Sequence, residues 1–205
     1  MKNNNVEVNL VSVNKGFAYD VKINSDEATL SEYVEALDNF LDEKVAPCLG
    51  CDNCCYQRIP LMLPDIYDYA GFAQEAVGEF LGAKAVIAKE GLALDIRLKQ
   101  VADEACVFLD SQEQRCTDHI HRSLVCHTYV CLPQTLRARE MREYLINQGE
   151  DALIAQLFNW NLLAEFADLQ HNYPVKENWQ GKTYQEILLK EVLSPKLWAA
   201  LTNPL

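Results

Sequence analysis

The pattern of apolar and polar positions predicts a β-hairpin near the start of the chain. Apolar residues alternate at Val6, Val8 and Leu10, and they alternate again from Phe17 to Ile23. Such alternation is typical of strands with one buried face, and the segment NKG between the two runs is a turn signal. We expect this hairpin to cover the core rather than to carry chemistry.

An amphipathic helix is predicted next, in the segment ATLSEYVEALDNFLDEKVAP. Thr29 and Glu32 have the spacing of a capping box, and the apolar residues that follow recur at helical intervals. Pro47 should end the helix, because proline lacks the N–H that the helix needs. The first cysteines therefore follow a helix, in a loop.

Short elements are predicted in the middle of the chain. RIPLMLP is expected to be extended, and Pro64 and Asp65 can start a helix that the following glycines should break or shorten. A second helical stretch is expected around residues 83–89, ending at Gly91. The segments LALDIRLKQV and CVFLD suit short strands, and SQEQR suits a polar turn.

The last third of the chain, residues 134–205, is predicted to be helical. One helix, TLRAREMREYLINQG, should end at Gly149, since glycine is the usual residue just past a helix C-terminus. The predicted fold class is α+β and mainly helical, with a small N-terminal β-hairpin, a cysteine-rich metal-binding centre and a C-terminal helical bundle. We expect a single domain over residues 1–205, with its metal-binding core at 48–131.

The amino-acid composition argues against two classes of binding partner. The 205 residues carry a formal net charge of -12, which repels nucleic acid and anionic membranes. No segment approaches the roughly 20 apolar residues that span a bilayer, and the N-terminus MKNNNVEVNL does not resemble a signal peptide. We therefore expect a cytoplasmic protein, whose thiols stay reduced and whose clustered cysteines hold a metal ion.

All eight cysteines fall into two groups about 50 residues apart. The C-x2-C spacing of the first group is common to zinc and iron–sulfur sites, so the predicted cofactor is zinc or iron, including an iron–sulfur cluster. Adjacent cysteines are hard to place on one tetrahedral ion, so the last two of that group serve different metals or only one of them is a ligand. The predicted ligands are Cys48, Cys51, Cys54, Cys55, Cys106, Cys116, Cys126 and Cys131.

Two other interpretations of the cysteines are weaker. Buried free thiols can act as small apolar residues, but this explains one or two cysteines better than eight in two groups. Disulfides are expected only as products of oxidation. Of the residues near the second group, His119, His127 and Arg122 are candidates to be further ligands or to contact the ligands.

The cysteine pattern resembles the CxxCxxCC (YkgJ-like) family of zinc- or iron-chelating proteins. CLGCDNCC is the first family element, CVFLD and RCTDHIHRSLVC match the next two, and Cys131 completes the set. The resemblance covers residues 48–131 and implies metal chelation. The family's usual Ile, Tyr, Pro and Arg are replaced here by Asp118, His119, Ser123 and His127, so the cysteine frame is kept while its neighbours differ.

The sequence does not decide whether the protein is an enzyme. A metal-dependent enzyme would keep an open coordination position, with Asp118, His119, His121 and Arg122 as the nearest acid, base or anion-binding groups. Alternatively, the C-terminal helices dock a protein partner on a metal-stabilised scaffold. Exposed side chains at Trp160, Phe166 and Trp198 would favour that function.

Overall fold

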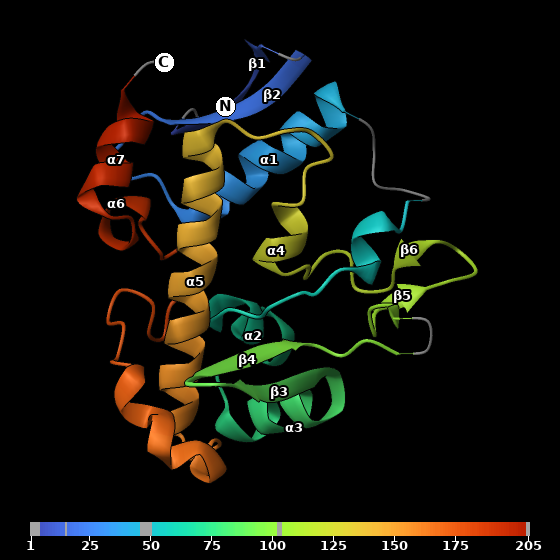
Figure 1. The fold of residues 1–205 in the computed structure, drawn as a ribbon, viewed down its shortest axis with the longest axis vertical. Helices are drawn as coiled ribbons and strands as arrows, with labels where there is room; N and C mark the ends of the chain where they lie inside the picture. Colours follow the sequence, from blue (N-terminus) through green and yellow to red (C-terminus); the bar gives the residue numbers. More distant parts are fainter. Residues whose placement is uncertain (1–4, 15, 46–50, 102–103, 204–205) are drawn as a thin grey trace. The chain divides into compact units, whose positions relative to one another are not determined.

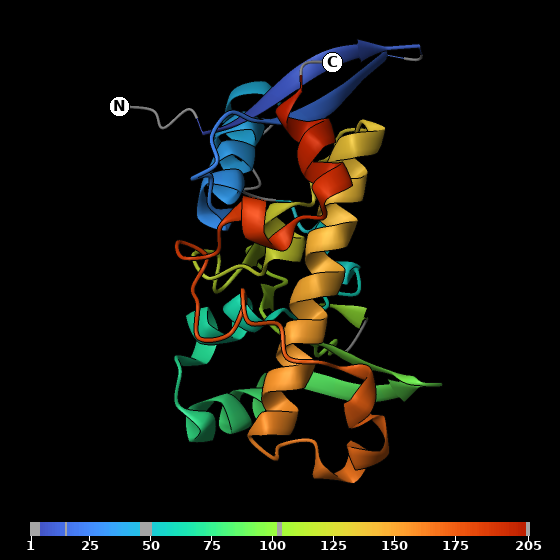
Figure 2. The same ribbon diagram turned by 90° about the vertical axis from the view of Figure 1, so that its left-hand side faces the viewer.

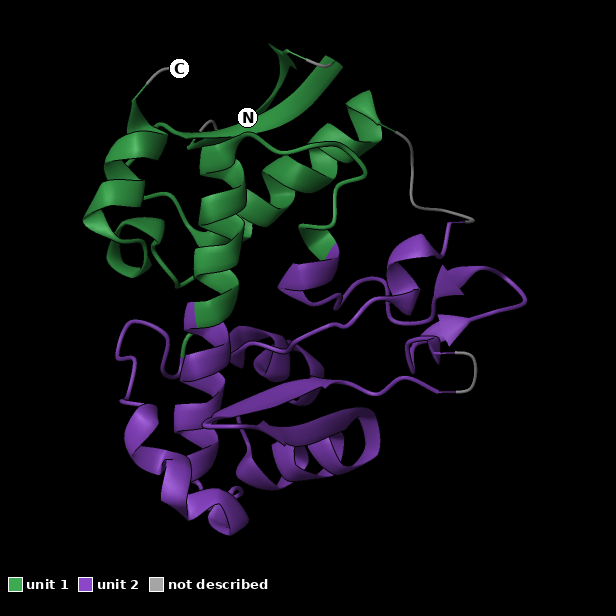
Figure 3. Ribbon diagram, viewed as in Figure 1, with its two compact units in different colours: residues 1–47, 127–147, 182–205 green, residues 48–126, 148–181 purple. Residues whose placement is uncertain are grey.

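The computed structural model describes residues 5–14, 16–45, 51–101 and 104–203. Their backbone is α+β, with helices and three separate pairs of antiparallel strands, as the sequence predicts (Figure 1). The chain divides into two compact units, each built from segments that are remote in sequence (Figure 3). Unit 1 contains residues 1–47, 127–147 and 182–205, and unit 2 contains residues 48–126 and 148–181.

Unit 1 contains the predicted hairpin and the predicted first helix. Strands β1 (Val6–Val13) and β2 (Gly16–Ile23) pair in antiparallel register, and Gly16 takes the positive φ of 115° that the tight turn requires. Helix α1 (Leu30–Lys44) starts with the complete capping box of Thr29 and Glu32 and packs on β1. Pro47, the expected end of this helix, lies outside the described residues.

A buried ion pair ties β2 to the helices at the other end of unit 1. Arg137 donates from Nε to both carboxylate oxygens of Asp20, at 2.9 and 3.1 Å, and Asp20 is only 3% exposed. The same guanidinium donates to the carbonyls of Ala200 and Asn203, so it also contacts the last helix of the described chain. The short helices there are α6 (Leu189–Val192) and α7 (Pro195–Thr202).

Unit 2 contains the short elements predicted for the middle of the chain. Helix α2 (Leu63–Ala70) has the expected proline as its second residue and is followed by Gly71, whose φ of 75° and ψ of -166° favour glycine. Helix α3 (Gln74–Lys84) follows and continues through the other two glycines of the segment without a break. The remaining elements are η1 (Asn53–Tyr56), β4 (Ala93–Leu98), β5 (Leu109–Asp110), β6 (Arg115–Cys116), α4 (Leu124–His127) and η3 (Ala164–Asn172).

The prediction of a helix around residues 83–89 is wrong. Ala85–Glu90 form strand β3, which pairs with β4 along its whole length, and Gly91 occupies the turn between them with a φ of 67°. Alanine, lysine and glutamate favour a helix locally, but the partner strand offers backbone hydrogen bonds and a buried face. Tertiary pairing therefore overrides the local preference.

The helix predicted to end at Gly149 does not end there. Helix α5 (Leu136–Asn159) runs through this residue without interruption (Figure 2). A Cβ atom added at Gly149 would lie 2.7 Å from Sδ, 2.8 Å from Cβ and 2.9 Å from Cγ of Met62. The glycine therefore permits close contact between α5 and α2 and is not a cap. In the described part of the chain, no helix is both long and apolar enough to cross a bilayer.

Candidate metal centre

The first cysteine group lies on a short 3₁₀ turn. Cys54 and Cys55 belong to η1, whose turn is closed by the Cys55 N–H donating to the carbonyl of Asp52 at 2.8 Å. Cys51 is exposed on the loop before it, and Cys48 lies outside the described residues. The carbonyl of Cys55 accepts a hydrogen bond of 2.7 Å from the N–H of Cys106. The two cysteine groups, remote in sequence, are therefore joined directly through the backbone.

The second group extends over three local structures. Cys106 is buried and sits where the chain enters the β5–β6 hairpin, with its carbonyl bonded to the Leu109 N–H at 2.9 Å. Cys116 is in β6, opposite Leu109. Cys126 is in α4, where the Ser123 hydroxyl lies 3.4 Å from its sulfur. These three cysteines of the group thus lie in different local structures of unit 2, whereas Cys131 belongs to unit 1.

Asp65 anchors the segment that carries Cys126. Its carboxylate is 1% exposed and accepts the Met62 N–H at 2.8 Å and the Leu124 N–H at 2.9 Å. One buried side chain therefore caps α2 and holds the first residue of α4. The sequence identifies Asp65 as a helix start, but it gives no signal for the second contact, which is 59 residues away.

The sulfur atoms of five cysteines lie close enough to influence one another electrostatically. A charge on Cys54 raises the pKa of each of the other four, which come from η1, the β5–β6 region and α4. Because this interaction falls off with distance, the five thiols share one region of unit 2. They are Cys54, Cys55, Cys106, Cys116 and Cys126.

The protonation states of these thiols differ. The pKa of Cys54 is lowered to about 6, chiefly by a hydrogen bond from the Cys55 thiol and further by a backbone hydrogen bond and the nearby charge of Arg122, against the effect of burial. Donating that proton raises the pKa of Cys55. Burial raises the pKa of Cys106 and Cys116, and it raises that of Cys126 to about 12. The Cys54 thiol therefore ionises more readily than the other four thiols of the region.

Tyr69 borders this region. Its ring stacks on Phe80 at 4.9 Å and on Phe108 at 5.4 Å between centroids. Burial raises the pKa of the Tyr69 phenol, and the charges of Asp65 and Cys126 add to the effect. The phenol is therefore neutral beside the thiols. The sequence gives no signal for this placement, because Tyr69 reads as an ordinary helix residue.

The thiols match a soft metal ion in chemistry. Thiolates are the preferred ligands of zinc and of iron–sulfur clusters, and the six cysteines of unit 2 that the structure describes are all free of disulfides. Over the described residues, which omit Cys48, no three His, Cys, Asp or Glu side chains already surround a common point as metal ligands. The thiols are thus gathered without forming a closed coordination shell.

The other predicted site residues fall in different places. Cys131 is exposed in unit 1, where His127 also lies with its Nδ1 3.0 Å from an oxygen of Asp38. In unit 2, His119 is exposed, and His121 contacts Asp118 at 2.7 Å near the surface. The charge of Arg122 lowers the pKa of Cys54 and of Cys116, so this guanidinium is the predicted neighbour that lies beside the thiols. The aromatic side chains whose exposure would favour docking of a protein partner are half-buried; they are Trp160, Phe166 and Trp198.

A comparison with family models matches part of the chain. Residues 47–148 fit the model of the CxxCxxCC family, which is described as a "putative zinc- or iron-chelating domain". No curated protein and no solved structure matches the chain. The matched range contains all eight cysteines, and the match confirms the resemblance seen in the sequence. Residues 47–148 of the chain therefore belong to the CxxCxxCC family.

Proposed function

We propose that this protein binds zinc or iron through thiolates of its two cysteine groups. The observation that carries the proposal is the gathering of five thiols around Cys54 in unit 2. Cys48, Cys51 and Cys131 complete the proposed ligand set, as the cysteine spacing suggests. The thiols must stay reduced to bind the metal, which fits a cytoplasmic location.

Metal binding explains why buried thiols would be kept so close together. Burial alone disfavours their ionisation, whereas a bound cation favours it and removes the mutual repulsion of the thiolates. Arg122 supplies part of this positive charge, because it already lowers the pKa of two of the thiols. When bound, the metal supplies a cross-link between segments that are remote in the sequence.

The cross-link should matter for folding. Structural zinc contributes about 10–16 kcal/mol in zinc-finger peptides, whereas a whole domain is typically stable by only about 5–15 kcal/mol. The β5–β6 hairpin and η1 are short elements with little apolar surface of their own. We therefore expect removal of the metal to disorder these elements first, while the core helices remain.

The test is the metal content of protein purified without oxygen. Elemental analysis and a visible spectrum distinguish zinc from iron, since a zinc–thiolate site is colourless and an iron–sulfur cluster absorbs in the visible range. Cys54→Ser and Cys126→Ser should each lower bound metal about tenfold or more. Ser111→Ala, in the exposed turn between β5 and β6, is the control and should retain full metal content. Unchanged metal content in both cysteine variants would refute the proposal.

A further inference from the structure

Ser123 is a buried polar residue beside the candidate metal centre. It is 0% exposed and directly precedes α4, the short helix that carries Cys126. Burying a hydroxyl costs free energy unless the group forms hydrogen bonds. The partners of this hydroxyl therefore indicate why a polar side chain is placed here.

The Ser123 hydroxyl forms two hydrogen bonds with Cys126. It donates to Sγ of Cys126 at 3.4 Å, and it accepts the backbone N–H of Cys126 at 3.5 Å. A serine hydroxyl has one proton to donate and two lone pairs that accept. Ser123 thus directs its proton to the sulfur and a lone pair to the backbone of the same residue.

The bond to the backbone does not by itself require a serine. It is the usual contact of a residue that precedes a helix, and an aspartate would accept the N–H as well. Ser194 makes the same kind of contact before α7, where its side chain accepts the Leu197 N–H at 3.3 Å. The hydrogen bond to sulfur needs the hydroxyl proton, so it is the contact that distinguishes Ser123 from a simple helix cap.

The surroundings favour a strong hydrogen bond to the sulfur. Ser123 is fully buried, so its hydroxyl is sheltered from water, and hydrogen bonds are stronger in the low dielectric of a protein interior. The next residue, Leu124, is fixed by the buried Asp65 carboxylate, which accepts its N–H at 2.9 Å. The hydroxyl and the sulfur are therefore held in this arrangement by contacts on both sides of Ser123.

We propose that Ser123 is a positioning residue of the metal centre, whose hydroxyl orients the Cys126 side chain and withdraws charge from its sulfur. A hydrogen bond to a thiolate stabilises its negative charge, and hydrogen bonds to ligands orient them and tune the bound metal. The inference rests on the proposed function, because it takes Cys126 as a ligand. It adds that a residue that is not a ligand determines how strongly one of the sulfurs donates electrons to the metal.

The experiment loads the full-length chain with cobalt(II) without oxygen and records the thiolate-to-cobalt charge-transfer band. Ser123→Ala should shift this band to longer wavelength, because the sulfur lone pairs rise in energy when the hydrogen bond is lost. It should also weaken cobalt binding about tenfold, as measured by competition with a chelator. Ser123→Thr keeps a hydroxyl and should retain the band of the parent protein.

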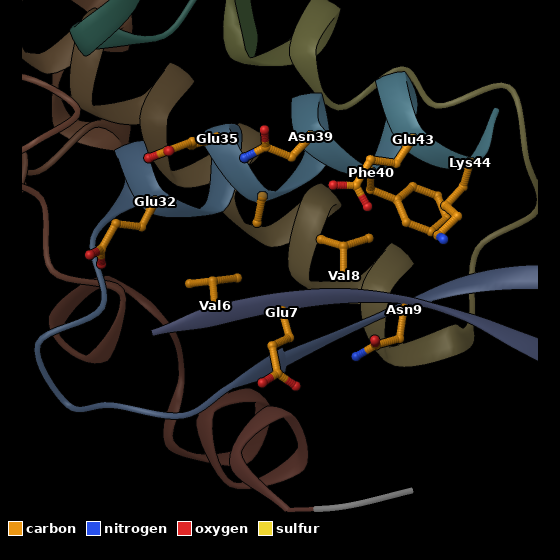
Figure 4. Close-up of a pocket in the computed structure, with 11 residues that line it drawn as sticks. Val6, Glu7, Val8, Asn9, Glu32, Glu35, Asn39, Phe40, Glu43 and Lys44 are labelled. Carbon is orange, nitrogen blue, oxygen red and sulfur yellow. The ribbon is translucent and has the colours of Figure 1, made fainter. Parts of the chain in front are cut away.

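Two controls separate this effect from general destabilisation and from cobalt bound elsewhere. Ser194→Ala removes the comparable helix cap of α7, a helix without cysteine, and should lower the unfolding midpoint without moving the band. A groove between β1 and α1 in unit 1 is lined by the carboxylates of Glu7, Glu32, Glu35 and Glu43 (Figure 4). Cobalt held there would have oxygen ligands and no thiolate band, so the band reports only on cysteine ligands.

The outcomes distinguish this inference from the proposed function. If the parent protein shows no thiolate band, the proposed function fails, and the role of Ser123 fails with it. If the parent shows the band and Ser123→Ala leaves its wavelength unchanged, only the role of Ser123 is refuted, even where cobalt binds more weakly. An equal shift in Ser123→Thr would also refute it. If the alanine variant does not fold, Ser123→Gly gives the same test, since glycine lacks the hydroxyl and is tolerated before a helix.

Discussion

Replacing Gly149 by alanine tests whether this residue is required for contact between α5 and α2. The new Cβ would lie within 2.9 Å of three side-chain atoms of Met62, which is itself fully buried. One of these atoms is the Met62 Cβ, at 2.8 Å, which cannot move without the backbone of α2. A rotation of the methionine side chain therefore cannot relieve the contact.

The magnitude follows from two opposing effects. Overpacking a filled core costs about 1–3 kcal/mol, and the upper part of this range applies because backbone must move. Replacing glycine by alanine inside a helix contributes about 1 kcal/mol in the other direction. Gly149→Ala should therefore destabilise the protein by about 1–2 kcal/mol. The matched control is Gly82→Ala in α3, where an added Cβ meets nothing within 4 Å and should stabilise by about 0.5–1 kcal/mol.

Urea unfolding monitored by circular dichroism measures both variants against the parent protein. The expected result is a lower unfolding midpoint for Gly149→Ala and a higher one for Gly82→Ala, with similar slopes. If both substitutions raise the midpoint equally, Gly149 is not a packing requirement, and the reasoning fails.

Three further changes test buried charges. Asp65→Asn retains one acceptor oxygen for the two backbone N–H groups, so it should lower the free energy of unfolding in urea by about 1–3 kcal/mol. It should also reduce metal content, because Leu124 leads into Cys126. Burial raises the pKa of Glu150 to about 7, so its ionisation lowers the stability of the folded protein as the pH rises from about 4.5 to 7. A Glu150→Gln variant should therefore gain stability at pH 8 and little at pH 5. Equal gains at the two pH values would contradict this reasoning. Asp20→Ala should cost about 3–5 kcal/mol, since it leaves the Arg137 guanidinium without its carboxylate, and a midpoint within error of the parent would refute that role.

Local signals in the sequence predicted local structure well. The alternating strands around NKG form the hairpin, and Thr29 with Glu32 forms the capping box. The proline and aspartate at the start of α2 and the glycine at its end act as expected. In each case the residues that determine the structure are within a few positions of one another.

The errors concern contacts between remote segments. Ala85–Glu90 has the composition of a helix and becomes a strand, because β4 provides a partner. Gly149 was predicted to end a helix but lies within α5. A glycine is needed there because Met62 packs directly against the backbone.

The sequence by itself determined the chemistry of this protein: the number of cysteines, their spacing and the family to which they belong. Only the tertiary structure decided which thiols gather, that Arg122 and Tyr69 border them, and that Asp65 holds the segment carrying Cys126. The physical reason is that ligand type and spacing are properties of short segments. The positions of side chains from remote segments depend on how those segments pack.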